Sequence, residues 1–243
     1  MRATSVTVST RWTWRLPTSE WGKLLSASRG ALTVFTNTGM WVVPPHQAVW
    51  VPALVPHEFE TAAGAATQTL HVHPTASRRL PNTCRAVHLS PLLRELLRRA
   101  IQLQTLDRRN RAQRNLMEIL LDELSVLPVA PIDLPMPRDP RALRAARLVR
   151  SRPEARLTLA EASRESGASG RTLERLFRNE TGLAFGTWRQ RARLLRALQL
   201  LAESENVTST AIAVDYESTS AFVAAFRRAI GTTPGQYFKN GER

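Results

Sequence analysis

Residues 157–179 read LTLAEASRESGASGRTLERLFRN and predict two short helices joined by a tight turn. Thr158 can cap the first helix, and Glu161 three residues later completes a capping box. Gly167 can supply the left-handed conformation that ends this helix, and Ser169 can cap the next one. The apolar residues at helical spacing predict a buried stripe, and they are Leu159, Ala162, Leu173, Leu176 and Phe177.

The second of these helices keeps a polar face that its apolar stripe does not cover. Two helices joined by a glycine turn, the second with exposed polar side chains, are typical of a helix-turn-helix, whose second helix enters the major groove of DNA. A polar face that only meets water is the alternative for one such pattern taken alone. The positions expected outside are Arg171, Thr172, Glu174, Arg175 and Arg178.

The same plan recurs in residues 207–231, VTSTAIAVDYESTSAFVAAFRRAIG. Thr208 and Ser218 can cap the two helices, and LERLFRNETG matches FVAAFRRAIG in its apolar positions and final glycine. The residues expected to pack are Ala211, Ile212, Val214, Phe222 and Phe226. The repetition favours two DNA-binding units over a helix face that is merely solvated.

A single helix over 184–204, AFGTWRQRARLLRALQLLAES, is expected to join the two units. At a rise of about 1.5 Å per residue it spans about 30 Å, close to one turn of B-DNA. A rigid spacer of that length can place two reading helices in successive major grooves. Its own Arg189, Arg193 and Arg196 can contact phosphates.

Residues 1–83 follow a different pattern, with alternating runs such as ALTVFT and AVWVPA. Period-two alternation of β-branched and aromatic residues, broken by Gly, Asn and Pro, predicts short antiparallel strands. We expect strands near 30–36, 40–43 and 47–51. Several such strands at short spacing indicate a small barrel or sandwich.

From about residue 88 the apolar period becomes helical. LSPLLRELLRRAIQL and NLMEILLDELSVL predict two helices, which the charged turn LDRRNR joins as an antiparallel hairpin. Ser90 can cap the first helix, with Pro91 at its first position. The expected apolar face comprises Leu89, Leu92, Leu93, Leu96, Leu97, Ala100, Ile101, Leu116, Ile119, Leu120, Leu124 and Leu127. Such a hairpin either covers the barrel or pairs with a second subunit.

Residues 127–140, LPVAPIDLPMPRDP, are rich in proline, which removes backbone donors and stiffens an extended chain. We place the main domain boundary here. The sequence therefore predicts an α+β multidomain protein with a barrel over 1–83, a helical hairpin over 84–127, a linker over 128–137 and an all-α double helix-turn-helix over 138–243.

The charge balance favours a polyanionic partner. Thirty-four basic against twenty acidic residues give a formal net charge of +14, and such a surface attracts nucleic acid or anionic membrane. Only Lys23 and Lys239 are lysines, so the coding bias of a GC-rich genome is the other explanation of the arginine content. We expect no membrane partner, because no apolar run approaches the ~20 residues that span a bilayer.

The redox chemistry and the N-terminus fit a cytoplasmic protein. MRATSVTVSTRW contains no apolar core of signal-peptide length. The single cysteine, Cys84, excludes an internal disulfide framework and fits a reducing compartment. Beside Arg85, this thiol is either a sensor of lowered pKa or a buried structural residue, and we favour the structural role.

Residues 138–243 resemble the double helix-turn-helix of the AraC/XylS transcription regulators. The resemblance rests on GASGRTLERLFRNETG, on the long joining helix, and on AVDYESTSAFVAAFRRAIGTTPGQYF, whose end is similar to the signature tail of that family. WVVPPHQAVWVPALVPHEFE, at 41–60, resembles the cupin-type barrel that precedes this module in one branch of the family. The resemblance covers nearly the full chain and implies a cupin-like effector domain.

The family's reading positions fall on Arg171, Thr172, Glu174 and Arg175 in the first unit. Arginine can bond guanine through two atoms and glutamate can accept from cytosine, and each such pair discriminates by roughly 1–3 kcal/mol. The second unit carries plainer side chains at the matching positions, which are Thr219, Ser220, Val223 and Ala224, followed by Arg227 and Arg228 for phosphates. We therefore expect the first unit to read bases and the second mainly to hold the backbone.

Further residues complete the expected DNA-binding set, namely Ser169, Arg178, Arg189, Arg193 and Ser218. One position departs from the family pattern. Asp215 stands where such turns usually carry glycine; it tolerates the left-handed region but adds a negative charge near DNA. This charge predicts weaker docking of the second unit.

Cupin barrels often hold a metal with a His-x-His pair, an acidic residue and a later histidine. His57 matches the later histidine, but no histidine stands near 17–19, where the pair should fall, and Leu54 replaces a common glycine. His71 and His73, two apart on a strand, can share a face and substitute for the pair. Without a carboxylate or thiolate at suitable spacing, we expect no metal and no cofactor.

A small-molecule effector is the other guest that the barrel can hold. The residues expected to line such a cavity are Trp41, Trp50, His57, Phe59, His71 and His73, and packing in an ordinary core is the alternative. No nucleophile–base pair, phosphate loop or paired carboxylates stands out in the sequence. We therefore do not expect an enzyme.

The sequence as a whole predicts a bacterial, cytoplasmic transcription regulator that binds double-stranded promoter DNA in a sequence-specific manner. A small-molecule effector would control it, the hairpin would make a homodimer, and RNA polymerase would be a partner if it activates. The alternative from another class is a cupin-type metalloenzyme with a helical appendage. A partner-binding module without sequence preference is the third hypothesis.

Overall fold

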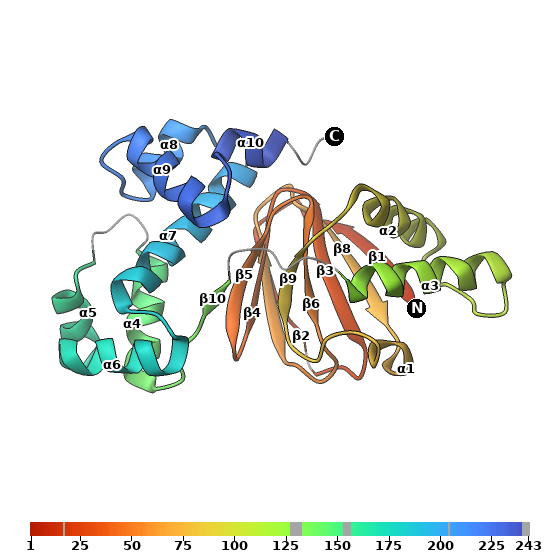
Figure 1. The fold of residues 1–243 in the computed structure, drawn as a ribbon, viewed down its shortest axis with the longest axis horizontal. Helices are drawn as coiled ribbons and strands as arrows, with labels where there is room; N and C mark the ends of the chain where they lie inside the picture. The colour runs from red at the N-terminus through yellow and green to blue at the C-terminus, as the bar shows by residue number, and fades with distance from the viewer. Residues whose placement is uncertain (17, 127–132, 153–156, 204, 240–243) are drawn as a thin grey trace. The chain divides into compact units, whose positions relative to one another are not determined.

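The computed structural model describes residues 1–16, 18–126, 133–152, 157–203 and 205–239. These residues form two compact units, the first from 1–36 and 41–126 and the second from 37–40 and 133–239. Among the described residues, the first unit contains nine strands and the helices of residues 74–125, and the second unit is mainly helical (Figure 1). In this part of the chain no helix combines the length and the apolar character that crossing a membrane requires.

The described strands form two five-stranded sheets. One sheet has the order β1-β8-β3-β6-β9 and the other has the order β10-β5-β4-β7-β2. The strands are β1 (Arg2–Thr7), β2 (Trp12–Leu16), β3 (Gly22–Arg29), β4 (Leu32–Thr36), β5 (Gly39–Val43), β6 (Gln47–Val51), β7 (His57–Thr61), β8 (Ala66–Val72), β9 (Arg85–His88) and β10 (Leu134–Pro135). A single helical turn, α1 (Pro74–Ser77), follows β8.

The three strands expected from the alternating runs are confirmed as β4, β5 and β6. All five residues of β5 and all five of β6 are buried, so these strands do not show the half-exposed alternation. The expected end of the barrel at residue 83 is too early. Arg85–His88 forms β9 and pairs with β6, because its central residues Ala86 and Val87 can pack on both faces of the sheet.

The core between the two sheets is mainly apolar. It takes side chains from β3, β6 and β9 on one side and from β4 and β5 on the other, namely Leu25, Ala27, Val49, Val51, Ala86, Leu32, Val34, Trp41 and Val43. Because direct antiparallel partners lie on the same face, this core fixes which alternate positions of each strand point inward.

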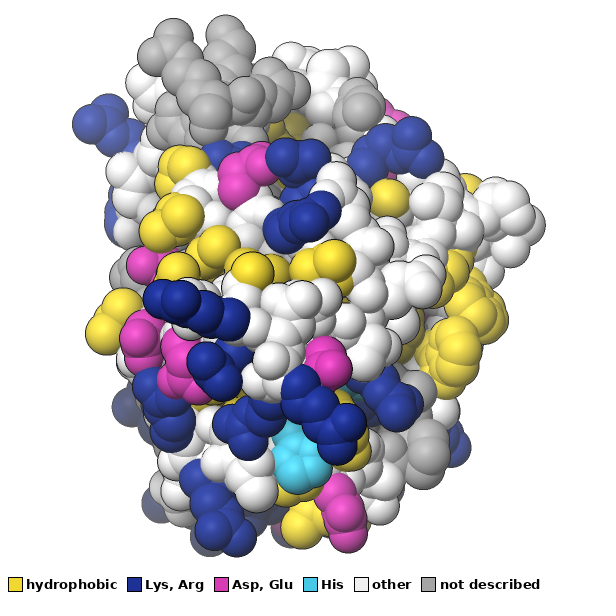
Figure 2. All heavy atoms as spheres, turned by 90° about the vertical axis from the view of Figure 1, so that its right-hand side faces the viewer, with side chains coloured by type: hydrophobic (Ala, Val, Ile, Leu, Met, Phe, Trp, Pro, Cys, Tyr) yellow, Lys and Arg dark blue, Asp and Glu magenta, His cyan; other side chains and the backbone are white. Residues whose placement is uncertain are grey.

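Helices α2 (Pro91–Leu103) and α3 (Arg111–Ser125) form the expected hairpin, with Ser90 as the N-cap of α2 and Pro91 at its first position. Leu92 and Ile119, expected on the apolar face, are instead 53% and 45% exposed. Figure 2 looks onto this side of the molecule and shows a band of apolar side chains between charged ones. Each helix can turn only one stripe toward the sheet, and these two residues lie outside it.

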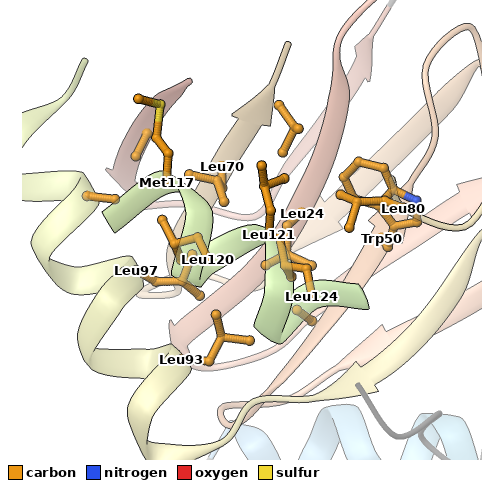
Figure 3. Packing of buried hydrophobic residues seen from close by; sticks show 14 of the residues in the cluster. Leu24, Trp50, Leu70, Leu80, Leu93, Leu97, Met117, Leu120, Leu121 and Leu124 are labelled. Atoms are coloured by element: carbon orange, nitrogen blue, oxygen red, sulfur yellow. The ribbon is translucent and has the colours of Figure 1, made fainter. Parts of the chain in front are cut away.

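The buried side of the hairpin covers the outer face of the sheet that contains β3, β6 and β8 (Figure 3). Met117 and Leu121 belong to this buried side, although the sequence did not single them out. Full burial of a leucine contributes about 1.5–3 kcal/mol. The main members of this core are Leu24, Trp50, Leu70, Leu80, Leu93, Leu97, Met117, Leu120, Leu121 and Leu124.

The second unit consists mainly of helices, which pack on two aromatic groups. They are α4 (Pro140–Ser151), α5 (Leu159–Ser166), α6 (Gly170–Thr181), α7 (Phe185–Ala202), α8 (Val207–Ala213), α9 (Thr219–Ile230) and α10 (Pro234–Lys239). Phe177 lies edge-on to Phe185 and Trp188 in one group, with ring centroids 5.1 and 5.2 Å away. In the other group, Phe226 lies between Phe222 and Tyr237.

The long joining helix is confirmed as α7, which is continuous over Phe185–Ala202. Its Trp188 is fully buried, and the indole Nε1 donates a hydrogen bond of 2.7 Å to the carbonyl of Pro135. Residues 128–132 of the expected linker lie outside the described residues. Leu134 and Pro135, also assigned to the linker, form the short strand β10, because their backbone pairs with Met40 and Gly39.

Candidate nucleic-acid interface

The turn between α5 and α6 has the local geometry that its sequence predicts. The Thr158 hydroxyl accepts from the Glu161 backbone amide at 3.2 Å, and the Glu161 carboxylate accepts from the Thr158 amide at 2.8 Å. Gly167 ends α5 with φ of 70°, and Ser169 is the N-cap of α6. The expected capping box, glycine turn and second cap are all confirmed.

Helix α6 buries its predicted stripe and exposes three arginines. Leu173, Leu176 and Phe177 are buried, whereas Arg171, Arg175 and Arg178 are exposed. The exposed guanidiniums form a cationic face that can bind phosphates or guanine edges.

The polar residues between these arginines are partly engaged within the domain. Thr172 donates its backbone amide to the Ser169 hydroxyl at 3.2 Å, and the two hydroxyls lie 2.9 Å apart. Glu174 accepts from the backbone amide of Phe185 at 3.4 Å and lies 3.8 Å from the guanidinium of Arg178. Thr172 and Glu174 are half-buried, so they support α6 as well as facing outward.

An arginine from α4 holds the end of α5 in place. Arg144 donates from Nε and Nη2 to the backbone carbonyl of Ser166, at 3.2 and 2.7 Å. Ser166 is the last residue of α5, immediately before Gly167. The sequence analysis missed Arg144, because its position in a separate helix gives no local sign of this contact.

The second helix pair follows the plan with two differences. Asn206, rather than the expected Thr208, is the N-cap of α8, and its side chain accepts from the Ser209 amide at 2.8 Å. Ile212, expected to pack, is 71% exposed, whereas Ala211 and Val214 are buried as expected. A helix of seven residues can bury only one narrow stripe, and Ile212 lies off it.

Asp215 adopts the left-handed conformation in the turn between α8 and α9, with φ of 58°. Its carboxylate lies 3.4 Å from the guanidinium of Arg193, so the negative charge expected near DNA has a counterion within the domain. Arg193 also donates to the carbonyl of Val214 at 2.7 Å and to the carbonyl of Asp215. Only 16% of the Arg193 side chain and 19% of the Asp215 side chain are exposed.

Two arginines of α7 are therefore engaged inside the domain rather than directed to phosphates as expected. Arg193 holds the α8–α9 turn, and Arg189 donates to the backbone carbonyl of Leu157 just before α5. The physical reason is that buried carbonyls at the ends of short helices need donors, and a long guanidinium reaches them.

Helix α9 presents small side chains around an open hollow. Ser218 is the expected N-cap, and its hydroxyl accepts from the Ala221 amide at 3.1 Å. Phe222 and Phe226 are buried as expected. The hollow is lined by Thr219, Ser220, Val223, Ala224, Arg227, Arg228 and Thr233. Two exposed arginines beside small side chains suit backbone contact better than bidentate base recognition.

The six expected effector-pocket residues do not share one space. Trp41 lies in the core between the sheets, but Trp50 lies on the outer face under the hairpin, where its Nε1 donates to the Pro81 carbonyl at 2.7 Å. His73 is the exposed N-cap of α1 and lies beyond the end of β8, so it does not share a strand face with His71. The face on which Trp50 lies depends on the strand register, and the position of His73 depends on where β8 ends. Local sequence does not determine either.

His57, Phe59 and His71 occupy inward positions of the sheets, together with Lys23, which the sequence analysis did not consider for a site. His57 pairs with Thr36 across β4 and is 4% exposed. Burial is the main cause that lowers the pKa of both histidines, and the nearby Lys23 charge lowers it further. Among the described residues there is no group of three or more His, Cys, Asp or Glu side chains that could hold a metal ion.

Cys84 is half-buried against the core between the sheets. Burial raises the pKa of its thiol to about 11, which keeps the thiol protonated at neutral pH. A reactive sensor thiol needs the opposite shift, so the geometry favours the structural role.

Comparison with known proteins identifies both parts of the chain. Residues 162–240 match the family model of a helix-turn-helix domain, and residues 23–125 match that of an AraC-like ligand binding domain. The first match includes α6 and α9, and the second includes strands β3 to β9 with the helical hairpin.

The relatives are transcription regulators. NimR of Escherichia coli K12, an HTH-type transcriptional regulator, is 35% identical over 216 residues, covering 89% of this chain and 79% of NimR. A second HTH-type transcriptional regulator, RipA of Corynebacterium glutamicum, is 38% identical over 104 residues, which cover 43% of this chain and 31% of RipA. A solved AraC-type regulator from Chromobacterium violaceum is 28% identical over 40% of this chain and 88% of its own, with a TM-score of 0.39.

These matches decide between the hypotheses that the sequence left open. The families and relatives are regulators rather than catalysts, so the metalloenzyme alternative is not favoured and the chain is not an enzyme. With a ligand-binding domain followed by a helix-turn-helix domain, this chain belongs to the AraC family of DNA-binding transcriptional regulators.

Proposed function

We propose that α5–α6 and α8–α9 are two helix-turn-helix units that grip one face of promoter DNA, with α6 reading bases and α9 mainly holding the backbone. Helix α7 has 18 residues, so it spans about 27 Å at 1.5 Å per residue. That length is about 7 Å less than the ~34 Å between successive major grooves on one face. The helix pairs at its two ends add their own width to this span, so the spacer can place both second helices on the same side of the duplex.

The observation that carries this division is the difference between the two exposed helix faces. Helix α6 presents Arg171, Arg175 and Arg178, and a guanidinium can bond the O6 and N7 atoms of guanine together. Helix α9 presents Ser220 and Ala224 with arginines only toward its C-terminal end. Contacts from small side chains discriminate weakly between base pairs, so base selectivity should reside in the first unit.

The first unit would bind a small-molecule effector in its cupin-like barrel and would form the homodimer through α2 and α3. Leu92 on α2 and Ile119 on α3 are both exposed apolar residues of the hairpin. Exposed apolar residues that gather on one surface are typical of protein contacts. The regulator would act in the cytoplasm, and as an activator it would contact RNA polymerase.

The test is selection of DNA fragments from a random pool by the purified full chain, followed by sequencing of the bound fraction. The expected result is a motif with a strongly selected element and, about one helical turn away, a weakly selected one. Footprinting on the selected fragment should protect both elements. A motif with two equally selective elements would contradict the division of labour, and enrichment of no sequence at physiological salt would contradict specific DNA binding.

A further inference from the structure

Lys23 is a buried cation in the sheet that forms one wall of the ligand-binding domain. It lies on β3 and alternates with Leu25 and Ala27, both of which point into the core between the sheets. Only 5% of its surface is exposed, and no carboxylate among the described residues pairs with it. Burial lowers the pKa of its ammonium group, which is the signature of a charge without a counterion. Buried lysines rarely occur unpaired.

Two histidines turn toward the same space from other strands. His71 on β8 stands directly opposite Lys23 in the strand register, and the Lys23 charge acts on both His71 and His57. The Nδ1 of His57 lies 2.9 Å from the Val55 carbonyl and must donate to it. Its Nε2 is buried and has no hydrogen-bond partner. The Thr61 hydroxyl, on the same strand, is also buried without a hydrogen-bond partner. Unsatisfied buried polar atoms are costly, so a polar guest that reached these two atoms would gain by bonding them.

An aromatic wall adjoins this polar group. Trp14 on β2 pairs with Phe59 on β7, and the two rings lie 6.2 Å apart and nearly parallel. Trp12 lies 4.6 Å from Trp14. Although direct strand partners share a face and Phe59 packs on the inner core, Trp12 and Trp14 are 41% and 40% exposed.

The aromatic wall is accessible because Trp12 and Trp14 lie on β2, an edge strand. β1 is an edge strand of one sheet and β2 is an edge strand of the other, and the two do not pair among the described residues. Arg2, on β1, lies opposite His71 and 5.6 Å from the ring of Trp21. A guest that lies against β2 therefore meets aromatic rings, while the positive charges of Lys23 and Arg2 belong to strands of the other sheet.

We propose that the effector of this regulator is a carboxylate with a flat or elongated apolar body, whose anionic group pairs with Lys23 while its body lies on Trp14 and Phe59. The inference rests on the proposed effector-binding function and specifies the chemistry of that site. A single negative charge matches the buried ammonium of Lys23, and the pairing supplies the counterion that no carboxylate of the described residues provides. The polar atoms of His57 and Thr61 can accept from or donate to further polar groups of the guest.

Other ligand classes fit less well. A metal cation would be repelled by Lys23, and a neutral sugar would leave the ammonium buried without a counterion. A phosphate dianion would need more than one buried donor cation. The aromatic rings also favour an apolar body over a fully polar one, because stacking and burial of apolar surface both contribute.

The experiment is titration calorimetry of the full chain, without DNA, with octanoate, 1-naphthoate and the uncharged amide of each. Both carboxylates should bind, and each should bind about tenfold or more tightly than its amide, because the ionic pair adds to a common apolar contribution. Lys23→Met should remove this preference while retaining amide binding. Arg11→Gln is the matched control, since it removes the same charge from a side chain that is 77% exposed.

The comparison of acid with amide in the unmodified chain needs no variant to fold, and a thermal melt establishes whether Lys23→Met is folded. Equal binding of acids and amides, or binding of neither, would overturn the inference. An acid preference that survives in Lys23→Met but falls in Arg11→Gln would overturn it as well. Carboxylate binding that leaves promoter affinity unchanged would contradict effector control instead, and the anion site would stand.

Discussion

The guanidinium of Arg193 in α7 lies over the ring of Tyr216, with 4.6 Å between the guanidinium carbon and the ring centroid. The same side chain bonds the carbonyls of Val214 and Asp215, so one residue of the joining helix fixes the turn between α8 and α9. Arg144 does the same for the turn between α5 and α6 through the Ser166 carbonyl. Each candidate reading helix therefore takes its position from an arginine on a different helix.

Replacing Arg193 with methionine should destabilise the DNA-binding unit by about 1–3 kcal/mol, because two inward carbonyls lose their donor. Urea denaturation followed by circular dichroism measures this change. Promoter affinity should fall for all sequences alike, since α9 loses its support. The control is Arg228→Met, which removes an exposed arginine and should leave the urea midpoint unchanged. Equal midpoints for the two variants would mean that Arg193 does not hold the turn.

Arg175→Ala should relax sequence preference, because an exposed arginine on α6 can bond a guanine edge, a contact worth roughly 1–3 kcal/mol. Arg228→Ala should weaken binding to all fragments alike and reduce the salt slope of log K by about 0.9, the value for one phosphate contact. Titrations at several salt concentrations, on the selected fragment and on one altered in its strong element, measure both effects. The reading face would be wrongly assigned if neither substitution changed binding to the selected fragment.

Trp188→Phe should reduce the free energy of unfolding of the helical unit by about 1–3 kcal/mol. The substitution keeps most of the aromatic packing but leaves the Pro135 carbonyl without the 2.7 Å hydrogen bond from Nε1. Trp12→Phe is the matched control, because Trp12 is 41% exposed and the loss of its indole N–H there should cost little stability. Urea melts of both variants give the comparison, and a larger loss in Trp12→Phe would contradict the prediction.

Acid should destabilise the ligand-binding unit as the pH falls from about 6.5 toward about 4. Burial lowers the pKa of His46 from 6.5 to about 4, so in this window the unfolded chain binds a proton that the folded chain does not. Stability therefore rises with pH across the window and is independent of this group above it. His57, His71 and His88 have pKa values lowered in the same direction and add to the effect.

His46→Asn should make this acid dependence shallower. Asparagine does not titrate, and it tolerates the left-handed backbone at this position, where φ is 69°. Urea melts at a series of pH values measure the slope for both proteins, and the difference at any pH should not exceed one proton. An unchanged slope in the variant would show that His46 does not titrate differently in the two states.

Local signals in the sequence determined most of the helical unit. The capping box at Thr158, the left-handed turn at Gly167 and the caps at Ser169 and Ser218 act over three or four residues. Their geometry is therefore legible without knowledge of the rest of the fold. The length of α7 followed for the same reason, since its helical pattern runs without interruption.

Only the tertiary structure decided which groups the long side chains contact and which way each strand face points. Arg193 is a residue type that often contacts phosphates, yet its side chain donates a hydrogen bond to the carbonyl of Val214, in a turn 21 residues away in the chain. Trp41 and Trp50 look alike in the sequence, but Trp41 on β5 points into the core between the sheets and Trp50 on β6 points to the outer face of the other sheet, because the strand register sets the face. Lys23, His57 and His71 meet only because three separate strands bring them together, and such long-range pairing leaves no local pattern to read.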